Sequence, residues 1–311
     1  MKKLLKAVAA IFVILIFNTG FTMAKEPDNV SRIALVSAFE PEINIFLQQI
    51  KEPEKTVING KIFTTGKLAG KDVVLFLSGI SIINASVNIQ LAIDNFNIFK
   101  IIFSGIAGGV NPALHIGDVV IPKKWANYQE QAFAYEGKNG WELMPWHTEE
   151  FKNFDMIFPQ YTMITSKGNA PNKEEAKFWF EVDSDMLKLA SEISSSVTLK
   201  KCAAENKCLQ NNPVIKIGGL GVSGPTFVNN KNYREWVWNN FTDSENNRID
   251  ALDMESSAAA TVAYMNKIPF IAFRSLSDLA GGGDEKNELP VFFQLAADNA
   301  GRMVLKFLEK L

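Results

Sequence analysis

Two carboxylates and one guanidinium stand where apolar segments of this sequence end. Glu255 follows the run Ile249 to Met254, while Arg274 and Asp278 close the run that begins at Pro269. In α/β proteins the ligand crevice lies outside the carboxyl ends of the strands, so these groups are expected to face one crevice. Such a set predicts a buried polar reaction site.

A third carboxylate, Glu42, follows the first apolar run, Arg32 to Ser37, in the sequence Ser-Ala-Phe-Glu-Pro-Glu. An acid in the first turn of a helix also interacts favourably with the helix dipole, so a purely structural role for Glu42 is an open alternative. Convergence of the three carboxylates on one crevice, with Arg274 to hold one of them, predicts acid–base chemistry.

Hydropathy predicts the elements that position these groups. Short apolar or β-branched runs predict buried strands over 32–37, 72–78, 100–105, 118–122, 214–222, 249–254 and 269–277. Helical patterns occur over 41–51, 82–96, 173–195, 231–241, 255–266 and 289–311. The alternation of the two predicts a layered α/β fold around a largely parallel sheet.

Composition and charge limit the partners. The chain has 311 residues, a formal net charge of −2 and a pI near 5.9. A chain with this small negative charge has no electrostatic field that would attract polyphosphate. Neither nucleic acid nor an anionic membrane is therefore predicted as a partner, and a small neutral ligand fits better. We expect one domain over 25–311, with an insertion at about 136–212 that is rich in Trp, Phe, Lys and Asn.

Residues 1–24 have the three parts of a secretory signal peptide. Lysines at 2, 3 and 6 precede an apolar run from Ala7 to Phe17, and Thr22 with Ala24 supplies a small-residue cleavage pattern. The run is too short to span a bilayer, which takes about 20 residues. We expect cleavage after Ala24 and an exported protein in the periplasm or medium, with an uncleaved anchor helix as the alternative.

The two cysteines, Cys202 and Cys208, are six positions apart. In an oxidising compartment such a pair is expected to close a small surface loop, and two free thiols are the alternative. Neither His115 nor His147 lies at a ligand spacing from them, so no metal site is predicted.

Three glycine-rich segments, 104–109, 218–224 and 281–283, are expected to form turns after strands. None has the Gly-Lys-Ser/Thr of a Walker loop, and no Gly-x-Gly-x-x-Gly opens a helix after the first strand. Nucleoside triphosphates and dinucleotides are therefore disfavoured, and no cofactor is predicted.

Several motifs, in order, resemble the purine nucleoside phosphorylase and uridine phosphorylase superfamily, in particular its methylthioadenosine/S-adenosylhomocysteine nucleosidase branch. The similarity covers Arg32 to Leu311 and weakens over 136–212. It rests on the segments 33–42, 78–80, 104–109, 115–120, 222–227, 253–255 and 274–278. It implies a three-layer α/β/α fold with a central mixed, largely parallel twisted sheet. The sequences of segments 254–258 and 277–282 are also similar to those of exported relatives such as plant bark and vegetative storage proteins.

The resemblance implies catalytic roles for the three acids. Asp278, oriented by Ser277, corresponds to the acid that protonates purine N7, so that the base leaves as a neutral group. Glu42 corresponds to the acid that activates water. Glu255 corresponds to the acid that accepts a hydrogen bond from the ribose 2′-hydroxyl, with Met254 packed on the sugar.

The same resemblance implies a substrate-binding set. Phe227 corresponds to the aromatic that stacks on the purine, the main chain of Val228 to the group that reads the base edge, and Arg274 to the support on the sugar side. Phe39 and Gly108 complete the set. The sequence departs from the pattern at Ile106, where the nucleosidases carry Ser, and at Pro225-Thr226, where many carry Asp-Ala.

These features predict a purine nucleosidase that hydrolyses the N-glycosidic bond. Phosphorolysis is the first alternative, but the first-strand loop carries Glu40 and Glu42, which repel phosphate, where phosphorylases carry an Arg. An exported nucleoside-binding or storage protein is the second alternative. Since many relatives are dimers whose partner closes the pocket, we expect a homodimer, with His115 and the segment 141–146 as candidates for that wall.

Overall fold

The computed structural model describes residues 29–282 and 289–311. The predicted signal peptide lies outside the described residues, as does Gly283 of the third glycine-rich segment. Within the described part of the chain, no helix is both long enough and apolar enough to cross a membrane.

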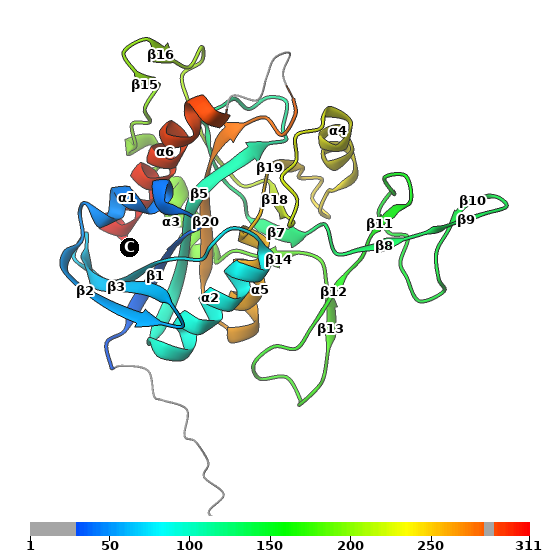
Figure 1. Cartoon of the computed structure of the whole chain (residues 1–311), viewed down its shortest axis with the longest axis horizontal. Coiled ribbons are helices and arrows are strands. Elements are labelled where there is room, and N and C mark those ends of the chain that lie inside the picture. The colour runs from blue at the N-terminus through cyan, green and yellow to red at the C-terminus, as the bar shows by residue number, and fades with distance from the viewer. Residues whose placement is uncertain (1–28, 283–288) are drawn as a thin grey trace, which may run out of the picture.

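A mixed sheet of twelve strands forms the centre of the molecule (Figure 1). Its main path runs β14-β7-β18-β19-β5-β1-β4-β3-β2, with β20 paired to β5 and β6, and β17 paired to β6. Strand β5 pairs in parallel with β1 and β20 but antiparallel with β19, so the predicted mixed sheet is confirmed. The strands of this sheet are β1 (Arg32–Ser37), β2 (Lys51–Ile58), β3 (Lys61–Leu68), β4 (Lys71–Leu77), β5 (Ile98–Gly109), β6 (Val119–Ile121), β7 (Lys124–Asn127), β14 (Phe180–Glu181), β17 (Ile215–Ile217), β18 (Leu220–Ser223), β19 (Ile249–Asp253) and β20 (Phe270–Asp278).

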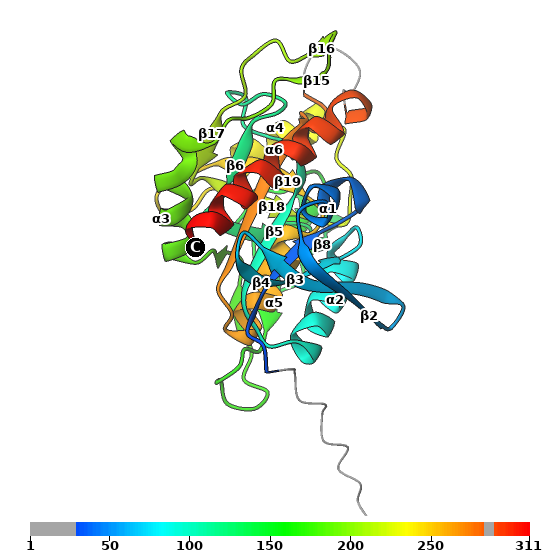
Figure 2. The ribbon, with the colours of Figure 1, turned by 90° about the vertical axis from the view of Figure 1, so that its left-hand side faces the viewer.

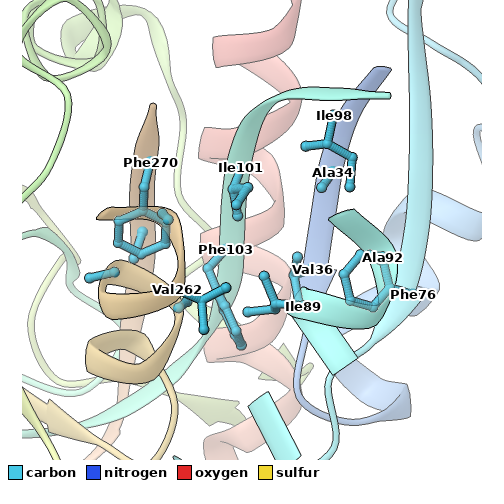
Figure 3. Packing of buried hydrophobic residues seen from close by; sticks show 14 of the residues in the cluster. Ala34, Val36, Phe76, Ile89, Ala92, Ile98, Ile101, Phe103, Val262 and Phe270 are labelled. Atoms are coloured by element: carbon cyan, nitrogen blue, oxygen red, sulfur yellow. The ribbon is translucent and has the colours of Figure 1, made fainter. Parts of the chain in front are cut away.

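Helices cover both faces of the sheet, which confirms the three-layer α/β/α architecture. Helices α2 (Ile82–Asn95) and α5 (Ser256–Asn266) pack on one face, where Ile89 and Val262 meet Phe103 of β5 (Figure 3). The other face carries α1 (Glu40–Leu47), α3 (Ser184–Ile193) and α6 (Leu289–Lys310) (Figure 2). Helix α4 (Lys231–Asn240) packs with the core around β18.

Three local predictions were wrong. The helix predicted from Lys173 begins at Ser184, because Phe180 is fully buried in a strand paired with β7, and tertiary pairing outweighs the local pattern. The strand predicted over 214–222 is two strands, because Gly218 and Gly219 adopt φ values of +87° and +68°. The glycine-rich segment 104–109 is extended and belongs to β5 instead of forming a turn.

Short antiparallel pairs project from the sheet over residues 131–177, a segment called here the arm (Figure 1). They are β8 (Gln131–Phe133) with β11 (Ile157–Pro159), β9 (Tyr135–Gly137) with β10 (Gly140–Glu142), and β12 (Thr162–Ile164) with β13 (Glu175–Lys177). The insertion expected at 136–212 contains most of the arm, helix α3 and the hairpin of β15 (Cys202–Ala204) and β16 (Lys207–Cys208). A disulfide joins Cys202 to Cys208 across this hairpin, as predicted.

Candidate active site

A cavity of about 290 Å³ opens where β1, β5, β18, β19 and β20 end. All the predicted catalytic and substrate-binding residues except Arg274 line it, and Arg274 is fully buried behind it. The lining residues are Ala38, Phe39, Glu42, Ile80, Ile106, Ala107, Gly108, Thr226, Phe227, Val228, Leu252, Asp253, Met254, Glu255, Ser277, Asp278 and Leu289. The tertiary structure therefore brings together segments more than 200 residues apart in the sequence.

Glu42 is held from two sides. Its Oε2 accepts hydrogen bonds from the N–H groups of Ala38 at 2.7 Å and Phe39 at 3.4 Å, and its Oε1 accepts one from Ile106 N–H at 2.8 Å. The first two bonds cap helix α1, so Glu42 has the structural role that the sequence left open. The bond to Ile106 of β5 goes beyond capping and holds a buried carboxylate in the cavity wall.

Behind the cavity Arg274 contacts Asp253 as well as Glu255 and Glu42. Its Nε lies 2.8 Å from Asp253 Oδ2 and donates to Ser256 Oγ, while its Nη2 donates to Glu255 Oε2 at 3.4 Å. Its Nη1 lies 4.0 Å from Glu42 Oε1. Arg274 therefore holds more than the one carboxylate expected, and its charge partly compensates a buried acidic cluster.

Gly105 of β5 allows this cluster to form. A Cβ at this position would lie 2.5 Å from both Arg274 Nη1 and Glu42 Oε1. Since real Cβ atoms do not approach other atoms so closely, the close approach of Glu42 to Arg274 requires glycine here.

Glu255 sits where β19 passes into helix α5. Burial raises its pKa to about 7; the Arg274 charge opposes the increase, and the Asp253 and Glu42 charges add to it. Its Oε1 accepts a hydrogen bond from Ser81 N–H at 2.9 Å. Ser81 has a φ of +84°, a strained conformation of the kind found at functional sites.

Burial also raises the pKa of Glu42, while the Arg274 charge and the three backbone N–H groups lower it. A carboxylate with a raised pKa is a stronger base. Glu42 is therefore suited to accept a proton from a bound water molecule.

Asp278 and Ser277 line the cavity at the end of β20. Asp278 is almost fully buried, its Oδ2 accepts a hydrogen bond from Ser277 Oγ at 3.1 Å, and its Oδ1 accepts one from Ala280 N–H at 2.8 Å. The backbone bond shows that Asp278 also caps the turn that follows. Because the side chain lines the cavity as well, its carboxyl group borders the space that a ligand would occupy.

Apolar groups form the rest of the cavity. Phe227 is 53% exposed, which suits a stacking platform, whereas the neighbouring Val228 is buried in the core and fixes the loop. Phe39, Met254 and Gly108 complete the predicted binding set. The cavity thus combines an apolar surface with a few converging polar groups, as small-molecule sites do.

Sequence reasoning missed two supports of the acids. Asp253 was part of a motif but was given no role, although its Oδ1 accepts hydrogen bonds from the N–H groups of Glu255 and Ser256. Ser81 carried no recognisable signal, because its contact with Glu255 spans 174 positions. His115 and the segment 141–146 are not among the residues that line the cavity within one chain.

The site combines, in a three-layer α/β/α fold, a buried carboxylate–arginine cluster with an apolar cavity, which is the arrangement of an enzyme that acts on a small molecule by acid–base chemistry. Residues 32–309 match the model of the phosphorylase superfamily, and the chain belongs to this family.

Curated relatives and solved structures of the same family cover nearly all of the described chain. A 5′-methylthioadenosine/S-adenosylhomocysteine nucleosidase of Bacillus thuringiensis is 27% identical over 281 residues, which are 90% of this chain and 99% of the relative. The structure of a putative nucleosidase of the same name from Borrelia burgdorferi, bound to adenine, has a TM-score of 0.64 and 26% identity over 90% of this chain and all of that one. The Neisseria meningitidis nucleosidase, in complex with methylthio-immucillin-A, has a TM-score of 0.65 at 24% identity over 91% of this chain and all of that one, and supports the fold.

Proposed function

We propose that this protein is a purine nucleosidase that hydrolyses the N-glycosidic bond of methylthioadenosine, S-adenosylhomocysteine or an adenosine-like nucleoside. The observation that carries the proposal is the buried set of Glu42, Glu255 and Asp278 around one cavity. Relatives named as nucleosidases for the first two substrates match over most of the chain.

Water is a better co-substrate than phosphate in this cavity. Among the described residues that line it, none is a lysine or an arginine, and the Arg274 guanidinium is already engaged by Glu255, Asp253 and Ser256. A phosphate dianion would therefore meet carboxylates without a free cation to bind it. This arrangement favours hydrolysis over phosphorolysis.

The reaction needs two proton transfers. Asp278, protonated at the start, gives its proton to purine N7 as the bond between C1′ and N9 breaks, and the bonding electrons leave with a neutral base. Glu42 takes a proton from the water whose oxygen bonds to C1′. The positive charge that develops on the sugar strengthens the hydrogen bond between the ribose 2′-hydroxyl and Glu255.

Release of free base by residues 25–311 tests the proposal. Adenosine, inosine, methylthioadenosine and S-adenosylhomocysteine are each supplied with and without phosphate, and wild type is compared with Asp278→Asn. We expect release without phosphate that falls by about 10²- to 10⁴-fold in the variant. Strict dependence on phosphate would make the protein a phosphorylase, and adenine binding without turnover would favour a binding or storage protein.

We also propose that the protein is a homodimer. Apolar side chains in and just before the first turns of α2 are exposed, with Ile80 at 51%, Ile83 at 77% and Val87 at 60%. A second copy that covers them would narrow the mouth of the cavity, of which Ile80 is part. Light scattering of the mature chain should give twice the monomer mass, and a monomer at assay concentrations would contradict the proposal.

We further propose export and removal of residues 1–24. The basic, apolar and small-residue parts of that segment support export, and so does the disulfide of the exposed hairpin. N-terminal sequencing of protein from an exporting host should begin at Lys25. An intact Met1 terminus on protein retained in the cell would contradict this proposal.

A further inference from the structure

Gln129 connects the root of the arm to the loop that carries Phe227. It lies between β7 and β8, and its Oε1 accepts a hydrogen bond from Thr226 N–H at 3.2 Å. Thr226 directly precedes Phe227, and both line the candidate active-site cavity. A contact spanning 97 positions thus reaches the backbone next to the predicted purine platform.

The Gln129 amide is oriented by two tyrosines. Its Nε2 donates to Tyr128 Oη at 3.2 Å and to Tyr233 Oη at 3.4 Å. Tyr128 is fully buried, and its ring centroid lies 6.1 Å from that of Tyr233. A backbone N–H is only a donor, so the amide oxygen must face Thr226, and the tyrosine hydroxyls fill the other side of the amide.

The loop itself makes room for this side chain. A Cβ at position 224 would lie 2.5 Å from Gln129 Cδ, so only glycine there admits the amide. Residues 225–227 are exposed between Gly224, whose N–H donates to Asp253 O, and the buried Val228. A loop that is fixed at both ends but exposed between them gains its internal support from Gln129.

We propose that Gln129 is a positioning residue that holds the Phe227 loop in the conformation that binds the purine base, an inference that rests on the proposed function. Gln129 does not line the cavity and takes no part in proton transfer. Its loss therefore weakens base binding and leaves the acid–base steps intact. The KM rises, while kcat and its pH profile stay unchanged.

Variants of equal size separate the hydrogen bond from the shape of the side chain. Gln129→Met keeps the volume and removes the acceptor, whereas Gln129→Glu keeps an acceptor for Thr226 N–H and lets the tyrosine hydroxyls donate. Gln131→Met is the matched control, because Gln131 stands two residues further on and its Nε2 donates to Tyr128 O at 3.4 Å instead of bonding to the loop.

Steady-state kinetics and calorimetry with adenine test the proposal. We expect Gln129→Met to raise the KM and the adenine Kd by about 3- to 10-fold, the usual effect of one lost hydrogen bond, with Gln129→Glu and the control near wild type. Wild-type KM and Kd values in Gln129→Met would refute the role of Gln129 without affecting the proposed function. Values for Gln129→Glu as high as those for Gln129→Met would do the same. A wild type that neither binds adenine nor releases base would refute the proposed function, and this inference with it.

Discussion

Replacing Gly105 by Ala tests whether the close approach of Glu42 and Arg274 matters for activity. The new Cβ would lie 2.5 Å from Arg274 Nη1 and Glu42 Oε1 and 2.9 Å from Glu42 Cδ. Neither partner moves freely, because Glu42 accepts three backbone hydrogen bonds and Arg274 is pinned by Asp253 and Ser256. Because the Cβ clashes with both groups, both must shift by roughly 1 Å to reach an ordinary contact distance.

The shift has two measurable consequences. Overpacking a rigid buried site costs about 1–3 kcal/mol of the free energy of unfolding, to be measured by urea denaturation. A displacement of about 1 Å in a group that activates water lowers kcat by roughly 100-fold, to be measured by base release. We therefore expect a folded Gly105→Ala protein that retains adenine binding but loses most of its turnover.

Gly109→Ala in the same strand is the matched control. Its Cβ would meet the ends of two leucine side chains, Leu276 Cδ1 at 3.0 Å and Leu279 Cδ2 at 3.1 Å, which move by a few tenths of an ångström at low cost. We expect near-wild-type turnover for this variant. Wild-type kcat in Gly105→Ala, or equal losses in both variants, would refute the reasoning.

Three further variants have expected outcomes. Glu42→Gln keeps the size of the side chain and one of its two acceptor oxygens but removes the base, so kcat falls by about 10²- to 10⁴-fold with adenine affinity unchanged; a fall in affinity alone would contradict water activation. Burial raises the pKa of Glu255 to about 7 in the folded protein, above its value near 4.5 in the unfolded chain. The protonated carboxyl group therefore stabilises the folded state below pH 4.5, and this contribution is lost as the pH rises through 7. Between pH 4.5 and 8 wild type should lose about 3 kcal/mol more unfolding free energy than Glu255→Gln, and parallel curves from urea denaturation would disprove this. Replacing both Cys202 and Cys208 by Ser should cost about 2 kcal/mol in the same assay, from the short closed loop, and leave kcat unchanged; a loss of activity would tie the hairpin to the site.

The hydropathy pattern predicted the bounds of those elements whose buried faces repeat regularly along the sequence. Strand β1 has the predicted bounds, and α2, α4, α5 and α6 lie within a residue of theirs, because apolar periodicity directly reflects the faces they bury. The pattern failed at Phe180, where a partner strand decides the conformation, and it missed the hairpin of β2 and β3, whose side chains are largely polar on β2. The pairing of β14 with β7 joins Phe180 to Trp125, which lie far apart in the chain, and no local signal encodes it. The hairpin does have a local signal, the Asn59-Gly60 turn between its strands, which hydropathy alone does not register.

The sequence by itself predicted Glu42, Glu255 and Asp278 as the catalytic acids and the pairing of Cys202 with Cys208, because charged residues at the ends of apolar segments, family motifs and cysteine spacing can be read along the chain. Only the tertiary structure decided that Arg274 holds Asp253 as well as Glu255, that Gly105 admits this cluster, and that Gln129 supports the loop of Phe227. These contacts join residues whose separation in the chain is large, and their energies depend on distances of a few ångströms. Such distances are fixed by the packing of the whole sheet and its helices, which no single segment specifies.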